Sequence, residues 1–446
     1  MSVQKTTLTP EQLEHNFADL HPAYTRDEAV AEAARCLWCY DAPCTRACPT
    51  HIDVPKFIRQ ILHDIPGAAA ETIFTENIFG GSCARACPTE VLCEGACVDK
   101  TLMGAPVQIG RLQRYATDHA MEKDLELFTP GPDSGKKVAI VGSGPAGMSC
   151  AHMLRRLGHA VTVFEAKNVA GGLNTLGIAA YKITTEFALS ELNQILKMGV
   201  DLKLNSPVDA KMLAQLHGEF DAVFLGIGLG QTSSLGIPGE DLEGVWEALD
   251  FIFQTHTRPF SECVVGRKVI VIGAGNTAVD VATEAVRLGA EQVIMAYRRT
   301  QHEMTAYDYE YELAKADGIH FLWNAQPVEF LGGENGKLGG VHFQQTRIDE
   351  SSRSAKIELV QGSDFAIDCD MAVLSLGQLP HKELLESIEG LTVEKGKLKI
   401  NEKCETGVHG LFAGGDCISK GAEIVNAVQE GKIAAISINE YLGSKC

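Results

Sequence analysis

Cysteines crowd into a short part of this chain. Fourteen occur among 446 residues, and eight of them lie between positions 36 and 97. The first run reads Cys36-x2-Cys39-x4-Cys44-x3-Cys48-Pro49, and the second reads Cys83-x3-Cys87-Pro88 followed by Cys93-x3-Cys97. Thiolates at such short spacings converge on one metal centre, and a proline after the last cysteine is typical of ferredoxin-like runs. We therefore predict two 4Fe–4S clusters.

Structural zinc is the main alternative for these runs, because four-cysteine zinc sites use similar spacings. Disulfides or inert thiols remain a further alternative, but disulfide scaffolds suit small secreted chains. The opening MSVQKTTLTPEQLEHNF has no apolar run before a small-residue cleavage site. No uninterrupted apolar stretch approaches the ~18 residues of a transmembrane helix. The sequence therefore predicts a cytoplasmic protein with metal or redox chemistry and no membrane partner.

Glycines carry a second kind of chemistry. In Gly142-x-Gly144-x-x-Gly147 the first glycine permits a strand-to-helix turn, the second lets the backbone approach a pyrophosphate, and the third lets the helix pack on the strand. Glu165 follows at the end of the next predicted strand, where a carboxylate binds ribose hydroxyls. A chance glycine turn would need none of these accompanying features. The predicted dinucleotide contacts are Gly142, Gly144, Pro145, Ala146, Gly147 and Glu165.

A second glycine turn, Gly273-x-Gly275-x-x-Ala278, has alanine in the third position. Arg298-Arg299 stands where the first unit has its acid. Guanidinium groups bind a ribose 2′-phosphate by charge-assisted bonds that a carboxylate would repel, which favours NADPH over NADH. The structural alternative is a pair of solvated surface charges. The predicted nicotinamide nucleotide contacts are Gly273, Ala274, Gly275, Asn276, Thr277, Arg298 and Arg299.

Regular elements must position these motifs. A capping box at Thr25–Glu28 opens one predicted helix, and helical spacing predicts others near Val54–Leu62 and Gly110–Glu122. The composition of residues 129–135 indicates a linker. Two strand–helix–strand units follow: Lys137–Val141, a helix to about Leu157 and Ala160–Phe164; then Lys268–Ile272, a helix to about Leu288 and Gln292–Tyr297.

The net charge of −19 excludes nucleic acid as a partner, since no basic stripe offsets repulsion from phosphates. Titratable residues such as His302 and Glu303 are expected at the surface, and no catalytic side chain is predicted. A disulfide reductase would need a redox-active cysteine pair beside its bound cofactor. The segment Gly171–Leu176 contains no cysteine, and the second nucleotide unit contains no CxxC. A redox-sensing binding protein is improbable because two complete nucleotide units are present.

Two further segments resemble the signatures of the two-dinucleotide flavoprotein superfamily: Gly171-Gly172-Leu173, and GLFAGGD ending in Gly414-Gly415-Asp416. The resemblance implies FAD in the first unit, with Asp416 at the ribityl chain; a helix N-cap is the structural alternative for this residue. The FAD-binding domain is then interrupted, with crossings near Leu225–Gly228 and Leu374–Gln378. The expected fold is α/β: a helical iron–sulfur domain at 1–130, an FAD-binding Rossmann-like domain at 131–258 and 375–446, and an inserted NAD(P)H-binding domain at 259–374.

The strings CLWCYDAPCTRACPT and GAAAETIFTENIFGGSCARACPTEVLCEGACV, with Gln108–Gln113, resemble the NAD(P)H-oxidising subunit of bacterial dihydropyrimidine dehydrogenase over about residues 20–442. The glutamate synthase small subunit is a more distant relative of the same build. The resemblance implies one cluster on Cys36, Cys39, Cys44 and Cys97. It implies a second on Cys48, Cys87, Cys93 and Gln113, with Cys83 as the alternative to Gln113.

The resemblance also implies the activity. Hydride from NADPH or NADH reduces FAD, and electrons pass through both clusters to an FMN- and iron–sulfur-containing partner that reduces uracil or thymine to the 5,6-dihydro base. The small subunit of NADPH-dependent glutamate synthase is the alternative. Two departures bear on this choice. Lys182 stands where the family has arginine near the flavin, and the segment Thr300–Thr305 is closer to glutamate synthase.

Overall fold

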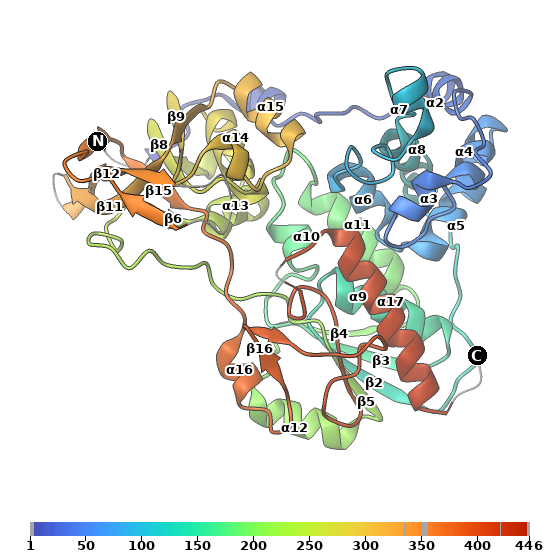
Figure 1. Ribbon diagram of the computed structural model, residues 1–446. Helices are drawn as coiled ribbons and strands as arrows, with labels where there is room; N and C mark the ends of the chain where they lie inside the picture. Colours follow the sequence, from blue (N-terminus) through green and yellow to red (C-terminus); the bar gives the residue numbers. More distant parts are fainter. Residues whose placement is uncertain (1–3, 334–335, 349–355, 420, 444–446) are drawn as a thin grey trace. The chain divides into compact units, whose positions relative to one another are not determined.

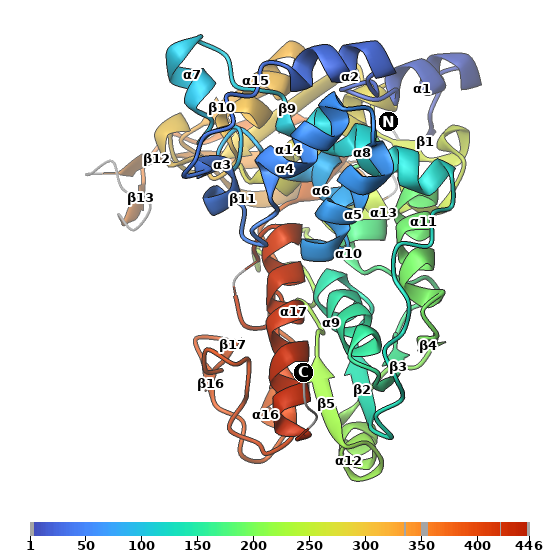
Figure 2. The same cartoon turned by 90° about the vertical axis from the view of Figure 1, so that its right-hand side faces the viewer.

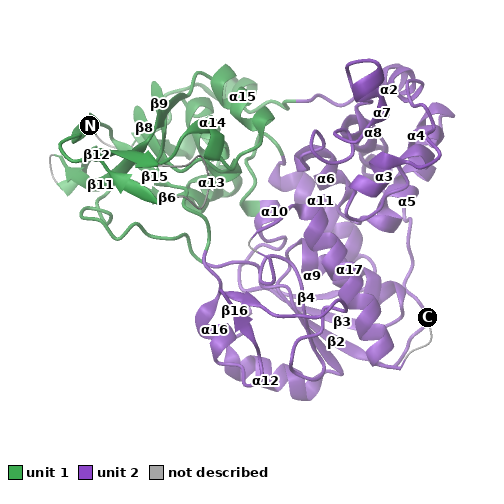
Figure 3. Cartoon of the chain, viewed as in Figure 1, with its two compact units in different colours: residues 1–20, 176–182, 231–378 green, residues 21–175, 183–230, 379–446 purple. Residues whose placement is uncertain are grey.

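The structure is a computed structural model that describes residues 4–333, 336–348, 356–419 and 421–443. The chain forms two compact units (Figure 3). Unit 1 holds Met1–Leu20, Leu176–Lys182 and Gln231–Gln378, and unit 2 holds His21–Thr175, Ile183–Gly230 and Leu379–Cys446.

The cysteine-rich part of unit 2 is helical, as predicted. The capping box at Thr25 and Glu28 begins α2. Helix α4 buries Val54, Phe57, Ile58 and Ile61 along one side, which is the spacing that predicted it. The helices are α2 (Arg26–Ala33), α3 (Pro43–Ala47), α4 (Val54–Leu62), α5 (Pro66–Glu76), α6 (Gly80–Ala86), α7 (Val98–Leu102) and α8 (Ile109–Glu122).

Unit 2 continues into a parallel sheet of order β18-β5-β2-β3-β4. Strand β18 pairs with β5 although Gln231–Gln378 of unit 1 lie between them in the sequence, so the first nucleotide domain is interrupted, as predicted. Helix α17 runs beside α9 in both views (Figures 1 and 2). The strands are β2 (Lys137–Val141), β3 (Ala160–Phe164), β4 (Asp201–Lys203), β5 (Ala222–Leu225) and β18 (Leu411–Ala413); the helices are α9 (Pro145–Arg156), α10 (Leu173–Leu176), α11 (Thr185–Leu196), α12 (Ala210–Glu219), α16 (Lys382–Glu386) and α17 (Ile424–Tyr441), with a β16–β17 hairpin (Val393–Glu394, Lys397–Leu398).

Unit 1 contains a second parallel sheet, of order β10-β9-β8-β15-β6. Its elements include β6 (Val245–Glu247), α13 (Ala248–Thr257), β8 (Lys268–Ile272), α14 (Asn276–Arg287), β9 (Gln292–Tyr297), α15 (Asp308–Ala316), β10 (His320–Trp323) and β15 (Met371–Leu374). A smaller antiparallel sheet comprises β11 (Ala325–Gly332), β12 (Leu338–Ile348), β13 (Ile357–Leu359) and β14 (Phe365–Asp368).

Three segments lie in a different unit from the one expected. Leu176–Lys182 lies in unit 1, although it was predicted to belong to the FAD-binding domain. Strand β6 pairs with β15, so residues 231–258 lie with the second nucleotide sheet, although the predicted boundary stood at 258. The amino-terminal α1 (Pro10–Asn16) also lies in unit 1, apart from the helical head. The side chain of Asn16 donates to the carbonyl of Arg287 at 3.0 Å, and β1 (Gln4–Lys5) pairs with β7 (Val264–Val265).

The close approach of α17 to α9 predicts a stability difference between two glycines. A methyl group on Gly431 would lie 2.1 Å from the carbonyl oxygen of Ala146, whereas one on Gly218 in α12 would meet nothing within 4 Å. We expect Gly431→Ala to destabilise unit 2 by about 1–3 kcal/mol through overpacking. Gly218→Ala should instead stabilise it by about 0.5–1 kcal/mol, because alanine loses less backbone entropy in a helix. Thermal unfolding midpoints measure both, and equal midpoints would contradict the packing.

Candidate functional site

The first glycine turn joins β2 to α9. Gly142 has a φ of +98°, and a side chain there would meet the carbonyl oxygen of Gly226 at 2.4 Å. A side chain at Gly147 would meet the carbonyl oxygen of Gly142 at 2.0 Å. Gly144, the N-cap of α9, has open space where its side chain would be. The turn therefore combines tight packing at two glycines with an open backbone at the third, which fits a bound pyrophosphate beside Pro145 and Ala146 at the helix start.

The buried carboxylate of Glu165 ties the segments of this turn together. Its Oε2 accepts from the backbone N–H of Ser143 at 3.0 Å and from the Ser143 hydroxyl at 2.6 Å. The same Ser143 oxygen accepts from the N–H of Gly171 at 2.9 Å. Glu165 thus lies at the end of β3 where a ribose-binding acid was predicted, and it also orders the turn. Ser143 was not predicted from the sequence, because it occupies a variable position of the glycine motif.

The two superfamily segments lie against the same turn. A side chain on Gly172 would approach the Cα of Gly144 at 3.1 Å, and one on Gly415 would approach the Cβ of Ala146 at 3.0 Å. Leu173 begins the short helix α10. The backbone N–H of Gly415, which follows Gly414, donates to Glu430 at 2.5 Å. The residues predicted to hold FAD therefore converge from three distant parts of the chain.

Asp416 lies close to this turn but does not cap the helix that follows. The N-cap of α17 is Glu423, which forms a capping box with Asn426. Asp416 Oδ1 accepts from the N–H of Ala422 at 3.1 Å, and burial raises the pKa of its carboxyl. Burial likewise raises the pKa of Glu430 to about 7. The structure therefore removes the N-cap alternative for Asp416, and its second oxygen can accept from a ribityl hydroxyl.

The second glycine turn joins β8 to α14 within unit 1. Gly273 has a φ of +142°, and a side chain there would meet the carbonyl oxygen of Ser375 at 2.2 Å. Gly275 is the N-cap of α14. Asn276 and the exposed Thr277 are the first two residues of this helix. Ala274 and Ala278 are buried, so the alanine in the third position packs without a gap. This turn has the same form as the first and fits a second dinucleotide.

Arg298 and Arg299 follow the end of β9, as the sequence predicts. Arg298 is exposed and Arg299 is half-buried. Their backbone is held in place, because the carbonyl of Arg298 accepts from Thr346 Oγ1 at 2.9 Å and that of Arg299 accepts from the N–H of Asn324 at 3.1 Å. The arginines are therefore presented from a fixed backbone.

Two nearby residues lie differently from expectation. His302 is exposed, but Glu303 is buried, so its predicted surface location is wrong. Glu303 Oε2 accepts from the Thr300 hydroxyl at 2.6 Å and its N–H at 3.1 Å, a structural capping role. Lys182 pairs with Asp280 at 2.7 Å and Glu310 at 2.5 Å within unit 1, so its charge is neutralised locally.

The first predicted set of cysteines is drawn together by the helical head. Cys36, Cys39, Cys44 and Cys97 line one cavity, which Val54, Ile58 and Ile109 complete with apolar side chains. Burial raises the pKa of Cys44 to about 12, and the charges of Cys36 and Cys97 add to the shift. Four neighbouring thiolates without a cation repel one another, and bound iron relieves this repulsion by holding each thiol in its deprotonated form. The donor set therefore fits an iron–sulfur cluster.

The second set surrounds α6. The hydrogen bond to Cys83 is the main cause that raises the pKa of Cys87, followed by burial and the charges of Cys83 and Cys93. Burial is the main cause for Cys93, and the charges of Glu94 and Cys48 add to it. Cys48, Cys83, Cys87 and Cys93 are thus neighbours. Among the described residues, no three His, Cys, Asp or Glu side chains are arranged so that they could hold one metal ion.

Gln113 of α8 contacts α6, the helix that carries Cys83. Gln113 Nε2 donates to the carbonyl of Gly80 at 2.7 Å, which leaves the amide oxygen as the remaining donor atom for a metal. The sulfur of Cys83 accepts from Asn77 Nδ2 at 3.2 Å. Both side chains are buried. The structure therefore brings both candidates for the eighth ligand to α6.

The contacts between Glu191 and α6 were not predicted from the sequence. Glu191 of α11 accepts from the backbone N–H groups of Gly81 and Ser82, at 2.8 and 3.2 Å, and from the Ser82 hydroxyl at 2.5 Å. Asn174, directly after the predicted flavin segment, donates to the Ser82 hydroxyl at 3.0 Å. Burial raises the pKa of Glu191 to about 7 against these hydrogen bonds. The available signal was an acid at helical spacing with Ala188, Leu192 and Ile195, on the otherwise apolar buried face of α11.

Among the described helices, none has both the length and the apolar composition that a membrane span requires.

Two family models and several curated relatives match this chain. The family model for pyridine nucleotide-disulphide oxidoreductases matches residues 136–431, and the model for dihydropyrimidine dehydrogenase domain II, 4Fe-4S cluster, matches residues 13–125. The glutamate synthase (NADPH) small chain of Escherichia coli K12 is 34% identical over 96% of this chain and 94% of its own length. The NAD-dependent dihydropyrimidine dehydrogenase subunit PreT of the same organism is 33% identical over 97% of this chain and 99% of its own.

Solved structures share the fold. Mycobacterium tuberculosis FprA in complex with NADPH superposes with a TM-score of 0.58 at 19% identity, over 70% of this chain and 85% of that one. Thioredoxin reductase of T. acidophilum gives 0.54 at 20% identity, over 69% and 100%. With the two family models, the fold is thus that of a flavoprotein reductase that carries an iron–sulfur domain at its amino-terminal end. The chain belongs to the pyridine nucleotide-disulphide oxidoreductase family, and it is an NAD(P)H-dependent flavin and iron–sulfur oxidoreductase subunit.

The two candidates for the eighth ligand predict different iron contents. If Gln113 completes the second cluster, Cys83→Ala should keep both clusters, whereas Cys87→Ala should lose one. Removing a thiolate ligand deprives the iron of a charged donor that neighbouring water cannot replace at a buried site. Iron and acid-labile sulfide per FAD, measured on anaerobically purified protein, check both variants. Loss of a cluster in Cys83→Ala, with Gln113→Ala unaffected, would assign Cys83 instead.

Proposed function

We propose that this chain is the electron-input subunit of a dihydropyrimidine dehydrogenase, which oxidises NAD(P)H and passes electrons to an FMN- and iron–sulfur-containing partner that reduces uracil or thymine. When bound, FAD accepts a hydride and the two clusters accept electrons singly. The proposal needs no catalytic acid or base from the protein. The chain supplies binding and position instead.

Each set of residues has a defined task in this proposal. Gly144 lets the backbone at the start of α9 approach the FAD pyrophosphate, Gly142 and Gly147 allow the turn and the helix packing, and Glu165 binds the adenosine ribose. The turn at Gly273 and Gly275 does the same for NAD(P)H. Seven cysteines and Gln113 hold the clusters: Cys36, Cys39, Cys44 and Cys97 for the first, and Cys48, Cys87, Cys93 and Gln113 for the second.

The single observation that carries the proposal is the hydrogen-bonded connection between the predicted flavin segment and α6. Asn174 stands directly after Leu173, and its amide donates to Ser82 at 3.0 Å. Ser82 precedes Cys83 and lies three residues before Arg85 and five before Cys87, the C-cap of α6. A flavin held by Gly171–Leu173 would therefore lie next to the helix whose far end carries a cluster ligand. This placement supports electron transfer from FAD into the head.

The pyrimidine partner is supported by two short segments. Asp41-Ala42-Pro43-Cys44 and the ending Cys93-x3-Cys97 are closer to the pyrimidine enzymes. Glutamate synthase is the second candidate, because its small chain matches this one at similar identity over nearly its whole length and the segment Thr300–Thr305 is closer to it. The proposed location is the cytoplasm, in a hetero-oligomer with the FMN-containing subunit.

The arginine pair predicts a change in nucleotide preference. Replacing Arg298 and Arg299 with glutamine should raise KM for NADPH at least about tenfold, because a charge-assisted bond contributes about 1.5–3 kcal/mol. KM for NADH should change less than about twofold. Steady-state dye reduction with each nucleotide measures the effect. Arg267→Gln is the matched control, since Arg267 is exposed in the same unit and pairs with Glu291 at 2.9 Å. Equal effects on both nucleotides would contradict the 2′-phosphate role.

The identity of the partner predicts which substrate the native complex reduces. The complex, purified through a tag on this chain, should contain an FMN protein and oxidise NAD(P)H when uracil is added. It should show no oxidation with 2-oxoglutarate plus glutamine. Nucleotide absorbance and mass analysis of the co-purified chain provide the measurement, with ferricyanide reduction as the control for an intact input subunit. A large amidotransferase subunit in place of the FMN protein would assign the chain to glutamate synthase.

A further inference from the structure

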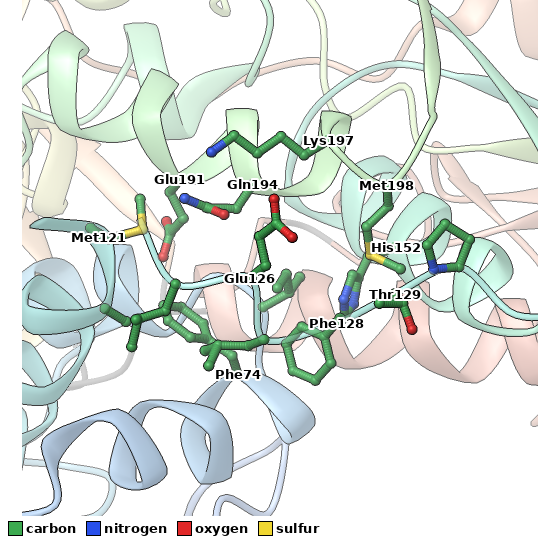
Figure 4. Close-up of a pocket in the computed structure, with 15 residues that line it drawn as sticks. Phe74, Met121, Glu126, Phe128, Thr129, His152, Glu191, Gln194, Lys197 and Met198 are labelled. Carbon is green, nitrogen blue, oxygen red and sulfur yellow. The ribbon is translucent and has the colours of Figure 1, made fainter. Parts of the chain in front are cut away.

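A cavity of about 150 Å³ lies within unit 2, between the helical head and the first nucleotide domain. None of the residues proposed for FAD, NAD(P)H or the clusters lines it. Most of its walls are apolar, with Phe74, Phe128 and Met198 among them. Figure 4 shows the side chains of α11 along one side and Phe74 and Phe128 along the other.

One wall residue has an unmet hydrogen-bonding capacity. The side chain of His152 is 4% exposed, and its Nε2 has no hydrogen-bond partner among the described residues. The Phe128 ring packs edge-on against the imidazole, with centroids 5.0 Å apart. Burial lowers the pKa of His152 to about 3, so the ring is neutral at ordinary pH. A buried polar atom without a partner is destabilising, and a ligand that bonds to Nε2 would remove that penalty.

Three other polar side chains of the wall are already engaged, and Glu126 and Thr129 also line it. Glu191 accepts three hydrogen bonds from Gly81 and Ser82. Gln194 Nε2 donates to Asp124 at 3.0 Å, and Lys197 pairs with the same carboxylate. The carboxylates of Glu126 and Glu191 in the wall disfavour an anion. The apolar residues that make up most of the lining disfavour a buried charge of either sign.

We propose that this cavity binds a small, uncharged aromatic molecule bearing one hydroxyl group, with the ring between Phe74 and Phe128 and the hydroxyl bonded to His152 Nε2. The size agrees, because a protein cavity of about 150 Å³ accommodates benzene. A hydroxyl serves either tautomer of a neutral imidazole, since it both donates and accepts. The site is separate from the proposed redox function, and this proposal does not depend on that function.

Phenol is the probe, and benzene is the control that lacks the hydroxyl. Calorimetric titration of the anaerobic, cofactor-loaded chain should show saturable binding of one phenol per chain. His152→Phe keeps a ring of similar size but removes Nε2, so it should weaken phenol binding about tenfold, the equivalent of one hydrogen bond of ~1.4 kcal/mol. Its effect on benzene should be less than about twofold. His152→Leu provides a second variant that lacks the acceptor.

Ala120→Leu tests the location independently. Ala120 is buried in the wall, so the larger side chain should fill the cavity and weaken both probes at least about tenfold. Flavin and iron content and the unfolding midpoint establish that each variant is folded. The proposal is overturned by absence of saturable phenol binding to the unaltered chain. It is equally overturned by phenol affinity that stays the same in the His152 variants, or by undiminished binding in Ala120→Leu.

Discussion

Glu191 lies at the junction on which the rest of unit 2 depends. It is buried, and it accepts hydrogen bonds from two backbone N–H groups at the start of α6 and from the hydroxyl of Ser82. A carboxylate at a helix N-terminus is stabilised by the free N–H groups there. Asn174 completes the junction from the flavin side. The helix that carries Cys87 is thereby fixed to the segment that follows Gly171 and Gly172, and the proposed path from FAD to the clusters requires this connection.

The nucleotide domains obey a different constraint, which is steric. At Gly142, Gly147 and Gly273 an added side chain would come within 2.4 Å of a carbonyl oxygen, so no other residue fits without rearrangement. At Gly144 the corresponding space is open, which leaves room for a ligand. The first motif thus uses Gly142 and Gly147 for close packing of its own chain and Gly144 for access. This difference explains why the motif has three glycines with separate tasks.

Much of this could be predicted from the sequence, because the motifs depend on local rules. The strands Lys137–Val141 and Lys268–Ile272 have the bounds that their apolar runs indicate. The insertion follows from the late flavin segment. The unit membership of β6 and α1 could not be predicted, because it depends on pairing with residues far along the chain. Glu303 and Glu191 were unforeseen for the same reason, since burial of a charge is decided by its distant partners.

The central claim is that electrons leave this chain through its iron–sulfur head. The most direct measurement is anaerobic turnover with the natural acceptor, followed as a function of cluster content in preparations depleted of iron to different degrees. The account predicts that this rate falls in proportion to the clusters remaining. Reduction of ferricyanide by NADPH should be retained, because ferricyanide can take electrons at the flavin. Full turnover with the natural acceptor in cluster-free protein would contradict it.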